Sequence, residues 1–410
     1  MLGSIIGDII GSRFEINPIT SKSFNLFDNS CRFTDDTVLT VAIADALLAK
    51  KDYKSKVLDY GLKYHNKGYG PGFIRWVDSK GKTQGHSYGN GSAMRIAAVG
   101  FYFETKEIVL KQAKKAVEMT HNHPEGIKGA QAIALAIFLA RNGYSKEEIK
   151  FEISNKFEYK FDKSISEIKE NYTFSIICQD TVPQALTCFF ESTDYEDAIR
   201  NAVSLGGDAD TLACIAGGVS EAFYGGVPQS IKTQARAFLP SEFLTVIDKF
   251  TSITEARDLQ KNKLLASAIS LAEEHHKGKT DKGGAPYINH VKRVMESGKT
   301  TDEKIVGVLH DIVEDTNITY EDLEDKGFPA QIVEAIWYVT KTEDDYMLFI
   351  DRVKRNDLAA RVKLNDLADN LDVKRLSNIE KADTDRLNKY LKAYEGLRGR
   401  NHLQEDKLYR

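Results

Sequence analysis

Apolar residues recur every three or four positions along almost the whole chain, which is the spacing of a helix that buries one face or more. The pattern is clearest in six segments: Val38–Leu48, Ala130–Ala140, Leu212–Phe223, Leu264–His276, Lys304–Glu314 and Ile332–Val339. Convincing strand patterns, in which apolar and polar residues alternate, are missing, and turn signals such as Asn142-Gly143 separate the helical segments. The sequence therefore predicts an all-α protein.

The length of the chain indicates two domains. Its 410 residues exceed the ~250–300 residues at which one hydrophobic core usually stops growing. The segment least suited to a core is Thr251–Lys263, where a charged run precedes the apolar Leu264 and Leu265. We therefore expect two helical domains, at residues 1–252 and 258–405.

Composition and charge narrow the class of protein. Hydrophobic residues make up 42% and charged residues 28%, which is typical of globular chains and excludes a disordered one. The formal net charge of −4 gives no basic field that would hold nucleic acid. The four cysteines form no CxxC pair, which favours a reduced, cytoplasmic location. No run approaches the ~18 apolar residues of a membrane span, and the N-terminal segment lacks a basic start, so we expect neither secretion nor a membrane partner.

Three acidic clusters stand out in the first 250 residues: Gly7–Glu15, Thr34–Thr37 and Gly206–Thr211. The second and third precede apolar helices, so the simplest interpretation is helix capping by Thr34 or Asp208. One cap is enough for a helix, however, and two carboxylates ~4 Å apart repel by about 4 kcal/mol at an effective dielectric near 20. A divalent cation removes that repulsion, and oxygen ligands without His or Cys favour Mg²⁺ or Mn²⁺.

Two glycines, Gly217 and Gly218, lie inside the apolar helix that follows the third cluster. Each lowers helix propensity by about 1 kcal/mol relative to Ala. Their presence is understandable if another helix packs very closely against this one. Such packing would fix the acidic ends of the two helices against each other.

Together with GNGSAMR at Gly89–Arg95 and THNHPEGIKGAQA at Thr120–Ala132, these clusters resemble the ADP-ribosylglycohydrolase family, which includes the dinitrogenase-reductase-activating glycohydrolases. The resemblance covers essentially the whole first domain. It implies an all-α bundle around two Mg²⁺ or Mn²⁺ ions, and hydrolysis of the bond between ribose C1 of ADP-ribose and an acceptor. The acceptor would belong to a protein, a nucleobase or a small molecule. The implied metal ligands are Thr34, Asp35, Asp36, Asp208, Asp210 and Thr211.

The same resemblance implies roles for individual residues. The implied catalytic residues are Glu15, Asp35, Asp36 and Asp210, and the implied substrate-binding residues are Gly89, Asn90, Gly91, Ser92 and His121. Glu15 would assist proton transfer beside the metals, although a solvated loop carboxylate is the alternative. The glycine-rich segment would offer backbone N–H groups to a diphosphate, or would be a plain tight turn. His121 and His123 face a ligand by resemblance or cap a helix, and we expect neither to bind metal.

In the second domain, polar residues gather on the predicted helix Lys304–Glu314. His310 and Asp311 share one face of this helix with Glu314, and Asp315 is close by. An isolated His-Asp pair is usually a surface pair. Here His290 precedes it and Asp366 follows it, which supplies a third and a fourth ligand for a mixed His/carboxylate metal site.

The motifs YINH, LHDIVEDT and VKLNDLADN, with Thr340-Lys341 between the last two, resemble HD-superfamily metal phosphohydrolases, specifically the alarmone hydrolases of the Rel/SpoT type. The match runs from about Leu264 to Leu376. It implies one Mn²⁺-like ion and a phosphorylated nucleotide as the substrate. The implied ligands are His290, His310, Asp311 and Asp366, with Glu314 and Asp315 activating a water and Asn370 contacting the substrate.

The chain departs from the alarmone hydrolases in one loop. It has Asp281-Lys282 where they carry Arg-Lys, and an acidic residue cannot stack on a guanine as Arg does. We therefore expect a substrate other than guanosine tetraphosphate.

Two other classes of function compete with this bifunctional hydrolase. One is a binding module that senses ADP-ribose or a nucleotide without turnover. The other is a structural protein, which is less consistent with the paired carboxylates.

Overall fold

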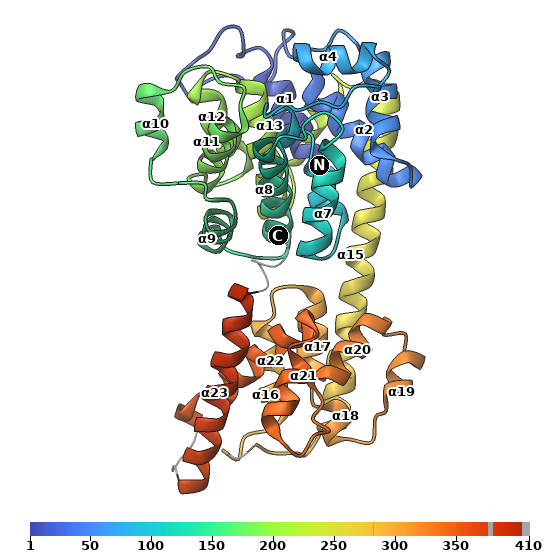
Figure 1. Ribbon diagram of the computed structural model, residues 1–410, viewed down its shortest axis with the longest axis vertical. Helices are drawn as coiled ribbons and strands as arrows, with labels where there is room; N and C mark the ends of the chain where they lie inside the picture. The colour runs from blue at the N-terminus through green and yellow to red at the C-terminus, as the bar shows by residue number, and fades with distance from the viewer. Residues whose placement is uncertain (282, 376–379, 404–410) are drawn as a thin grey trace. The chain divides into compact units, whose positions relative to one another are not determined.

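The computed structural model describes residues 1–281, 283–375 and 380–403. Every regular element within these residues is a helix, which confirms the all-α prediction (Figure 1). The chain divides into two compact units, Met1–Glu255 and Ala256–Arg410, and the division lies inside α15 (Ser241–His275). The two predicted domain ranges, and the HD assignment of the second, stay predictions.

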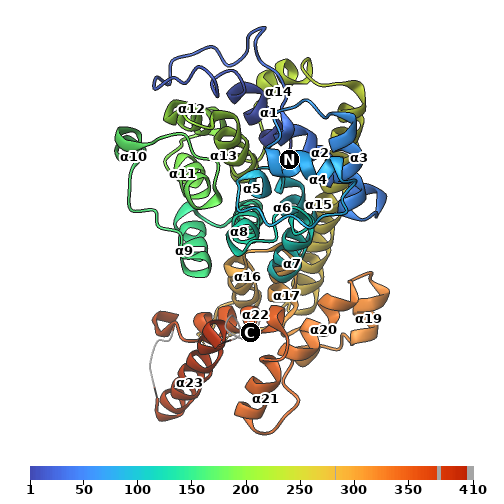
Figure 2. The ribbon, with the colours of Figure 1, turned by 45° about the horizontal axis from the view of Figure 1, so that its top comes forward.

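The helices of the first unit range from 4 to 18 residues, and each buries at least one residue. They are α1 (Leu2–Gly11), α2 (Asp35–Ala49), α3 (Tyr53–Lys63), α4 (Pro71–Asp78), α5 (Gly91–Met94), α6 (Ala97–Tyr102), α7 (Lys106–Val117), α8 (Pro124–Arg141), α9 (Lys146–Phe157), α10 (Ile165–Asn171), α11 (Cys178–Phe190), α12 (Tyr195–Leu205), α13 (Ala209–Phe223) and α14 (Gln229–Arg236). Helix α13 is central, because it packs against α1, α8, α11 and α12 (Figure 2).

The second unit has its own hydrophobic core. Its elements after α15 are α16 (Ile288–Ser297), α17 (Thr301–Leu309), α18 (Ile312–Asp315), α19 (Tyr320–Asp325), α20 (Ala330–Val339), α21 (Tyr346–Val353), α22 (Asp357–Asn370), a 3-10 helix (Val373–Arg375) and α23 (Lys381–Leu403). Helix α22 is the centre of this unit and contacts α16, α17, α20, α21 and α23. Among the described residues, no helix combines the length and apolar character needed to cross a membrane.

Five of the six segments with helical spacing are helical as predicted, and one prediction is wrong in its detail. The segment Lys304–Glu314 is not one helix, because α17 ends at Leu309 and α18 begins at Ile312. Between them, Asp311 has φ −102° and ψ 3°, outside the helical range. His310 and Asp311 therefore lie at a break between helices and not on one continuous helical face.

The closest helix contact in the first unit joins α1 to α13. All ten residues of α1 are buried. A Cβ atom added at Gly7 would lie 2.1 Å from the carbonyl oxygen of Ala213, and one added at Gly217 would lie 2.4 Å from that of Gly3. A Cβ atom added at Gly11 would lie 2.5 Å from the nearest backbone atoms of α13. The two backbones thus touch along their length, which confirms the close packing expected from Gly217 and Gly218.

This contact leads to a prediction about stability. Gly7→Ala places a methyl group against the backbone of α13, so the helices must separate, and such overpacking typically costs ~1–3 kcal/mol. We expect the free energy of unfolding to fall by at least that amount in urea denaturation followed by circular dichroism. Gly72→Ala is the matched control, because nothing lies within 4 Å of its added Cβ. Equal stability of the two variants would contradict the close contact.

Candidate active site

The carboxylate of Asp8 in α1 holds the start of α2. Its Oδ2 accepts hydrogen bonds from the backbone N–H groups of Thr34 (2.9 Å) and Thr37 (3.1 Å) and from the Thr37 hydroxyl. Its Oδ1 accepts from the Thr34 hydroxyl at 2.7 Å. Because Asp8 is fully buried and uses both oxygens in this way, it fixes the TDDT segment relative to α1.

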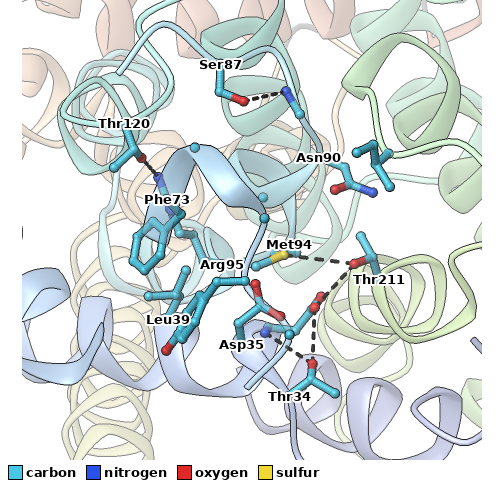
Figure 3. A pocket seen from close by; sticks show the side chains of 18 of the residues that line it. Thr34, Asp35, Leu39, Phe73, Ser87, Asn90, Met94, Arg95, Thr120 and Thr211 are labelled. Atoms are coloured by element: carbon cyan, nitrogen blue, oxygen red, sulfur yellow. Dashed lines mark hydrogen bonds between the residues drawn. The ribbon is translucent and has the colours of Figure 1, made fainter. Parts of the chain in front are cut away.

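The TDDT and GGDADT segments meet directly. The hydroxyl of Thr211, in the first turn of α13, donates to Oδ2 of Asp36 at 3.2 Å. Figure 3 shows Thr34 and Thr211 linked by hydrogen bonds to one carboxylate between them. The other oxygen of Asp36, Oδ1, is buried and has no hydrogen-bond partner in the part of the chain that the structure describes.

Two groups of three carboxylates share Asp210. Oxygens of Asp8, Asp36 and Asp210 lie within 4.8 Å of one another, and so do oxygens of Glu15, Asp208 and Asp210. All of these side chains except Glu15, which is half-buried, are at most 6% exposed. Four of the five predicted acidic residues of this unit are therefore gathered at one place, and Asp8 joins them. The fifth, Asp35, is not in either group.

Burial and mutual repulsion disfavour the charged forms of these acids. Burial, and then the charges of Asp8 and Asp35, raise the pKa of Asp36 well above its usual range. The pKa of Asp210 is raised by burial and then by Asp208 and Asp36. A bound cation would reverse these shifts, because it favours the ionised carboxylates.

The alternative of helix capping holds for α2 but not for α13. The hydroxyl of Thr34 accepts a hydrogen bond from the backbone N–H of Asp36 at 3.3 Å and so caps α2. Asp208 occupies the N-cap position of α13, yet its side chain makes no capping hydrogen bond. Its Oδ2 instead accepts from Nδ2 of Asn90 at 2.6 Å, which turns the carboxylate toward the other acids.

A cavity of about 1160 Å³ opens on this cluster. It is lined by all six predicted metal ligands of the first unit and by most of the other predicted residues: Glu15, Gly89, Asn90, Gly91 and His121. Ser92 does not line it. Its hydroxyl donates to the carbonyl oxygen of Gly89 at 3.3 Å and so stabilises the conformation of the loop.

The backbone N–H groups of the Gly89–Ser92 loop are largely engaged within the protein. Gly89 N–H donates to Oγ of Ser87 at 3.0 Å, and Asn90 N–H donates to the carbonyl oxygen of Ile176 at 2.8 Å. Helix α5, which begins at Gly91 within this segment, has only four residues. The loop is therefore a tight turn, and a diphosphate could use only the N–H groups that remain.

The two neighbouring histidines have different environments. His123 is the N-cap of α8, and its Nδ1 accepts from the backbone N–H of Glu125 at 3.2 Å, so the capping interpretation is right for this residue. His121 is 7% exposed and lines the cavity. Its Nδ1 lies 2.8 Å from Oγ1 of Thr120 and 3.2 Å from Nη2 of Arg95.

In the second unit, two imidazole rings converge on one carboxylate. Nε2 of His290 lies 3.3 Å, and Nε2 of His310 3.5 Å, from Oδ1 of Asp366. The Nδ1–H of His310 donates to the carbonyl oxygen of Gly307, and that of His290 donates to Asp369 at 2.6 Å. Both Nε2 atoms therefore carry the lone pair in the neutral ring and point at a common centre, as metal ligands do.

Asp311 belongs to the same cluster. Its Oδ2 lies 3.0 Å from Nε2 of His310 and accepts a hydrogen bond from the Tyr287 hydroxyl. Burial alone lowers the pKa of His310, but Asp311 and Asp366 outweigh burial and raise it to about 10. Asn370 donates from Nδ2 to Oδ1 of Asp366 at 2.6 Å, so it contacts the cluster directly.

The two predicted catalytic acids of this unit, Glu314 and Asp315, differ in their hydrogen bonding. Oε2 of Glu314 accepts from the backbone N–H of Lys341 at 2.9 Å and so tethers the segment after α20. Asp315 is exposed, and partial desolvation of its carboxylate followed by the charge of Asp311 raises its pKa.

The loop that departs from the alarmone hydrolases is a closed turn. Oδ1 of Asp281 accepts from the backbone N–H groups of Gly283 (2.9 Å) and Ala285 (3.0 Å). Lys282 lies outside the described residues. Asp281 therefore shapes this turn in addition to setting its charge.

The sequence analysis assigned no role to three residues that organise the two sites: Asp8, which lies in the first acidic cluster, Arg95 and Asp369. For Asp8 a signal exists, because it is the single charged residue in the apolar run LGSIIGDIIG. A charge in a helix buried on all sides requires hydrogen-bonding partners. The partners of Arg95 and Asp369 come from segments distant in the sequence, so no local pattern marks these residues.

Comparison with known proteins gives the family. The family model described as ADP-ribosylglycohydrolase matches residues 1–262. Mouse ADP-ribosylhydrolase ARH3 is 26% identical over 326 residues, which covers 60% of this chain and 88% of that protein. ADP-ribosylarginine hydrolase Tri1 of Pseudomonas putida (strain GB-1) is 28% identical over 265 residues, with coverage of 55% and 69%. A solved structure, "ADP-ribosylglycohydrolase-related protein complex", is 23% identical with a TM-score of 0.45 and covers 58% of this chain and 93% of its own. The chain belongs to the ADP-ribosylglycohydrolase family.

Proposed function

We propose that the first unit hydrolyses the bond between ribose C1 of ADP-ribose and an acceptor atom. The observation that carries this proposal is the meeting of two carboxylate triads at the wall of one cavity. The cavity, at about 1160 Å³, exceeds the ~300–1,000 Å³ of pockets that hold drug-sized ligands, so it leaves room for a nucleotide sugar.

The donor set fits two Mg²⁺ or Mn²⁺ ions. Every side chain in it offers oxygen, the buried Oδ1 of Asp36 has no protein partner among the described residues, and hard cations prefer such ligands. When bound, the ions would orient the ribose hydroxyls and lower the pKa of a water. The residues that would hold them are Thr34, Asp35, Asp36, Asp208, Asp210 and Thr211, with Asp8 holding the TDDT segment in place.

Glu15 is our candidate for the proton-transferring group. It lines the cavity within 4.8 Å of Asp208 and Asp210, and burial followed by the charge of Asp208 raises its pKa. Its carboxylate would take a proton from the attacking water as the water oxygen bonds to C1. The same proton would pass to the acceptor atom as the bond from C1 to the acceptor breaks.

We assign the diphosphate of the substrate to the side of the cavity formed by Gly89, Gly91 and His121. Beside this loop, Tyr88 is 48% exposed and its ring lies 5.1 Å from that of His123, which offers a surface on which a purine can stack. The acceptor remains one of three kinds: an ADP-ribosylated side chain, a nucleobase or a small molecule. Release of ADP-ribose from arginine- and serine-linked peptides, from modified nucleic acid and from ADP-ribosylated small molecules would separate them.

Removing a metal ligand should abolish this activity. We expect Asp36→Asn to lower ADP-ribose release by about 100-fold or more, because even residues behind the ligands contribute ~10–100-fold. EDTA should have the same effect on the unmodified protein, and Mg²⁺ or Mn²⁺ should restore it. Release can be followed by chromatography of free ADP-ribose.

A second measurement separates loss of the site from loss of the fold. Burial disfavours the charged form of Asp36, so replacing this carboxylate by a neutral amide should not destabilise the fold. In EDTA, Asp36→Asn should therefore melt at a temperature no lower than the unmodified protein. Asp162→Asn, at an exposed carboxylate, should leave both activity and melting temperature unchanged. Full activity of Asp36→Asn would overturn the proposed metal site.

We also propose that the second unit is a metal-dependent phosphohydrolase for a phosphorylated nucleotide. The observation that favours it is the convergence of both Nε2 atoms of His290 and His310 on Asp366, with Asp311 at the same centre. Nitrogen and carboxylate ligands together suit a Mn²⁺-like ion. When bound, this ion would supply an activated water. Asp315 is the better candidate for the base, because Glu314 is tethered to the backbone of Lys341.

Loss of one imidazole should remove metal binding and turnover together. We expect His310→Ala to eliminate Mn²⁺-dependent phosphate release and to weaken Mn²⁺ binding in isothermal titration calorimetry by at least ~10-fold. His65→Ala, at an exposed histidine paired with Asp78, is the control. Mn²⁺ binding without turnover of any nucleotide would move this unit to the sensing class, and the absence of both would refute the site.

A further inference from the structure

Arg95 follows α5 directly and is fully buried at the wall of the cavity. Its Nη2 donates to Oγ1 of Thr120 at 2.6 Å and lies 3.2 Å from Nδ1 of His121. Its Nε and Nη1 are buried without a hydrogen-bond partner in the described part of the chain. Burial lowers the pKa of Arg95 to about 10, so the guanidinium still carries its charge at neutral pH.

This arrangement determines which nitrogen of His121 carries the proton. A guanidinium has donors only, so Nδ1 of His121 must accept from it. The Thr120 hydroxyl already accepts from Arg95, and its own proton has two acceptors in reach, Nδ1 of His121 at 2.8 Å and the carbonyl oxygen of Val117 at 3.4 Å. Burial and then the charge of Arg95 lower the pKa of His121 well below its usual range, so the ring is neutral. A neutral ring that accepts at Nδ1 carries its single proton on Nε2.

Nε2 of His121 faces the glycine-rich loop. It lies 3.2 Å from the position that a Cβ on Gly91 would occupy and 3.8 Å from the corresponding position on Gly89. Both glycines line the cavity. The absence of a side chain at Gly91 therefore leaves room in front of this N–H for a ligand atom.

We propose that Arg95 is a positioning residue that holds His121 as the Nε2–H tautomer, so that His121 donates to an oxygen of a phosphate group beside Gly91. The claim that His121 binds a phosphate rests on the proposed function of the first unit. The claim about the tautomer does not, because it follows from the donors around Nδ1. In the opposite tautomer Nε2 would present a lone pair to the phosphate and repel it.

A purely structural role for Arg95 would be costly. A buried guanidinium with two unsatisfied nitrogen atoms costs more free energy than an apolar side chain of similar shape. Thr120 alone could order His121 through its hydroxyl, but a hydroxyl donates or accepts and so leaves the tautomer open. Only a group that cannot accept fixes the direction of the hydrogen bond to Nδ1.

The tautomer can be measured directly on the full-length protein. In a long-range ¹H–¹⁵N correlation spectrum of histidine-labelled protein at pH 7, assigned by the loss of one ring in His121→Gln, we expect an acceptor-type Nδ1 and a protonated Nε2. A protonated Nδ1 in the unmodified protein would overturn the proposal, whatever the activity.

Variants then connect the tautomer to function. Arg95→Met removes the charged donor but keeps a long buried side chain, and we expect the single tautomer to be lost. The KM for an ADP-ribosylated peptide should rise about 10- to 100-fold, the range for hydrogen bonds to charged groups, with a smaller change in kcat. Arg95→Lys, which keeps a donor-only group, should restore the tautomer and much of the KM.

The control is Arg236→Met, at a surface guanidinium paired with Asp248. It should leave the His121 spectrum and the KM unchanged.

If Arg95→Met fails to fold, the spectrum of Arg95→Lys and that of the unmodified protein still decide the tautomer. An unchanged tautomer with a changed KM in Arg95→Met would show that Arg95 acts in another way, and the proposal would fall. No ADP-ribose release by the unmodified protein would refute the proposed function and leave the tautomer result standing.

Discussion

The backbone contact between α1 and α13 is the constraint on which the first unit depends. Gly3, Gly7 and Gly11 lie one helical turn apart and bring the two helices into backbone contact. Because side chains do not separate the helices, Asp8 on α1 comes within reach of the acids at the start of α13. Asp8 in turn holds the start of α2 through Thr34 and Thr37, so one helix contact positions both acidic segments.

This arrangement concentrates negative charge where folding alone would avoid it. Burial and neighbouring acids raise the pKa values of Asp36 and Asp210, which means that the ionised cluster opposes the folded state. The hydrogen bonds to Asp8 offset part of that cost. Such local conflicts with stability are expected at functional sites, and the cations that we propose for this site would relieve the conflict.

At three histidines, a hydrogen bond to Nδ1 determines whether Nε2 donates or accepts. Nδ1 of His310 donates to the carbonyl oxygen of Gly307, and that of His290 donates to Asp369, so each Nε2 is an acceptor whenever the ring is neutral. At His121 the partner of Nδ1 is a donor, Arg95, so Nε2 is left as a donor. The partner on one nitrogen therefore sets the chemistry of the other. The first two rings suit a cation, and the third suits an anion.

The sequence by itself determined the helical class, the positions of most helices and the identity of the clustered acids, because helical periodicity and motif composition are local properties. It also indicated the close packing of α13, through Gly217 and Gly218. Only the tertiary structure decided that Asp8 joins the acids, that Asp208 turns to Asn90 instead of capping its helix, and that the helix at His310 breaks. These features depend on contacts between residues far apart in the chain. The energy of a buried polar group is set by its spatial neighbours, which no local pattern contains.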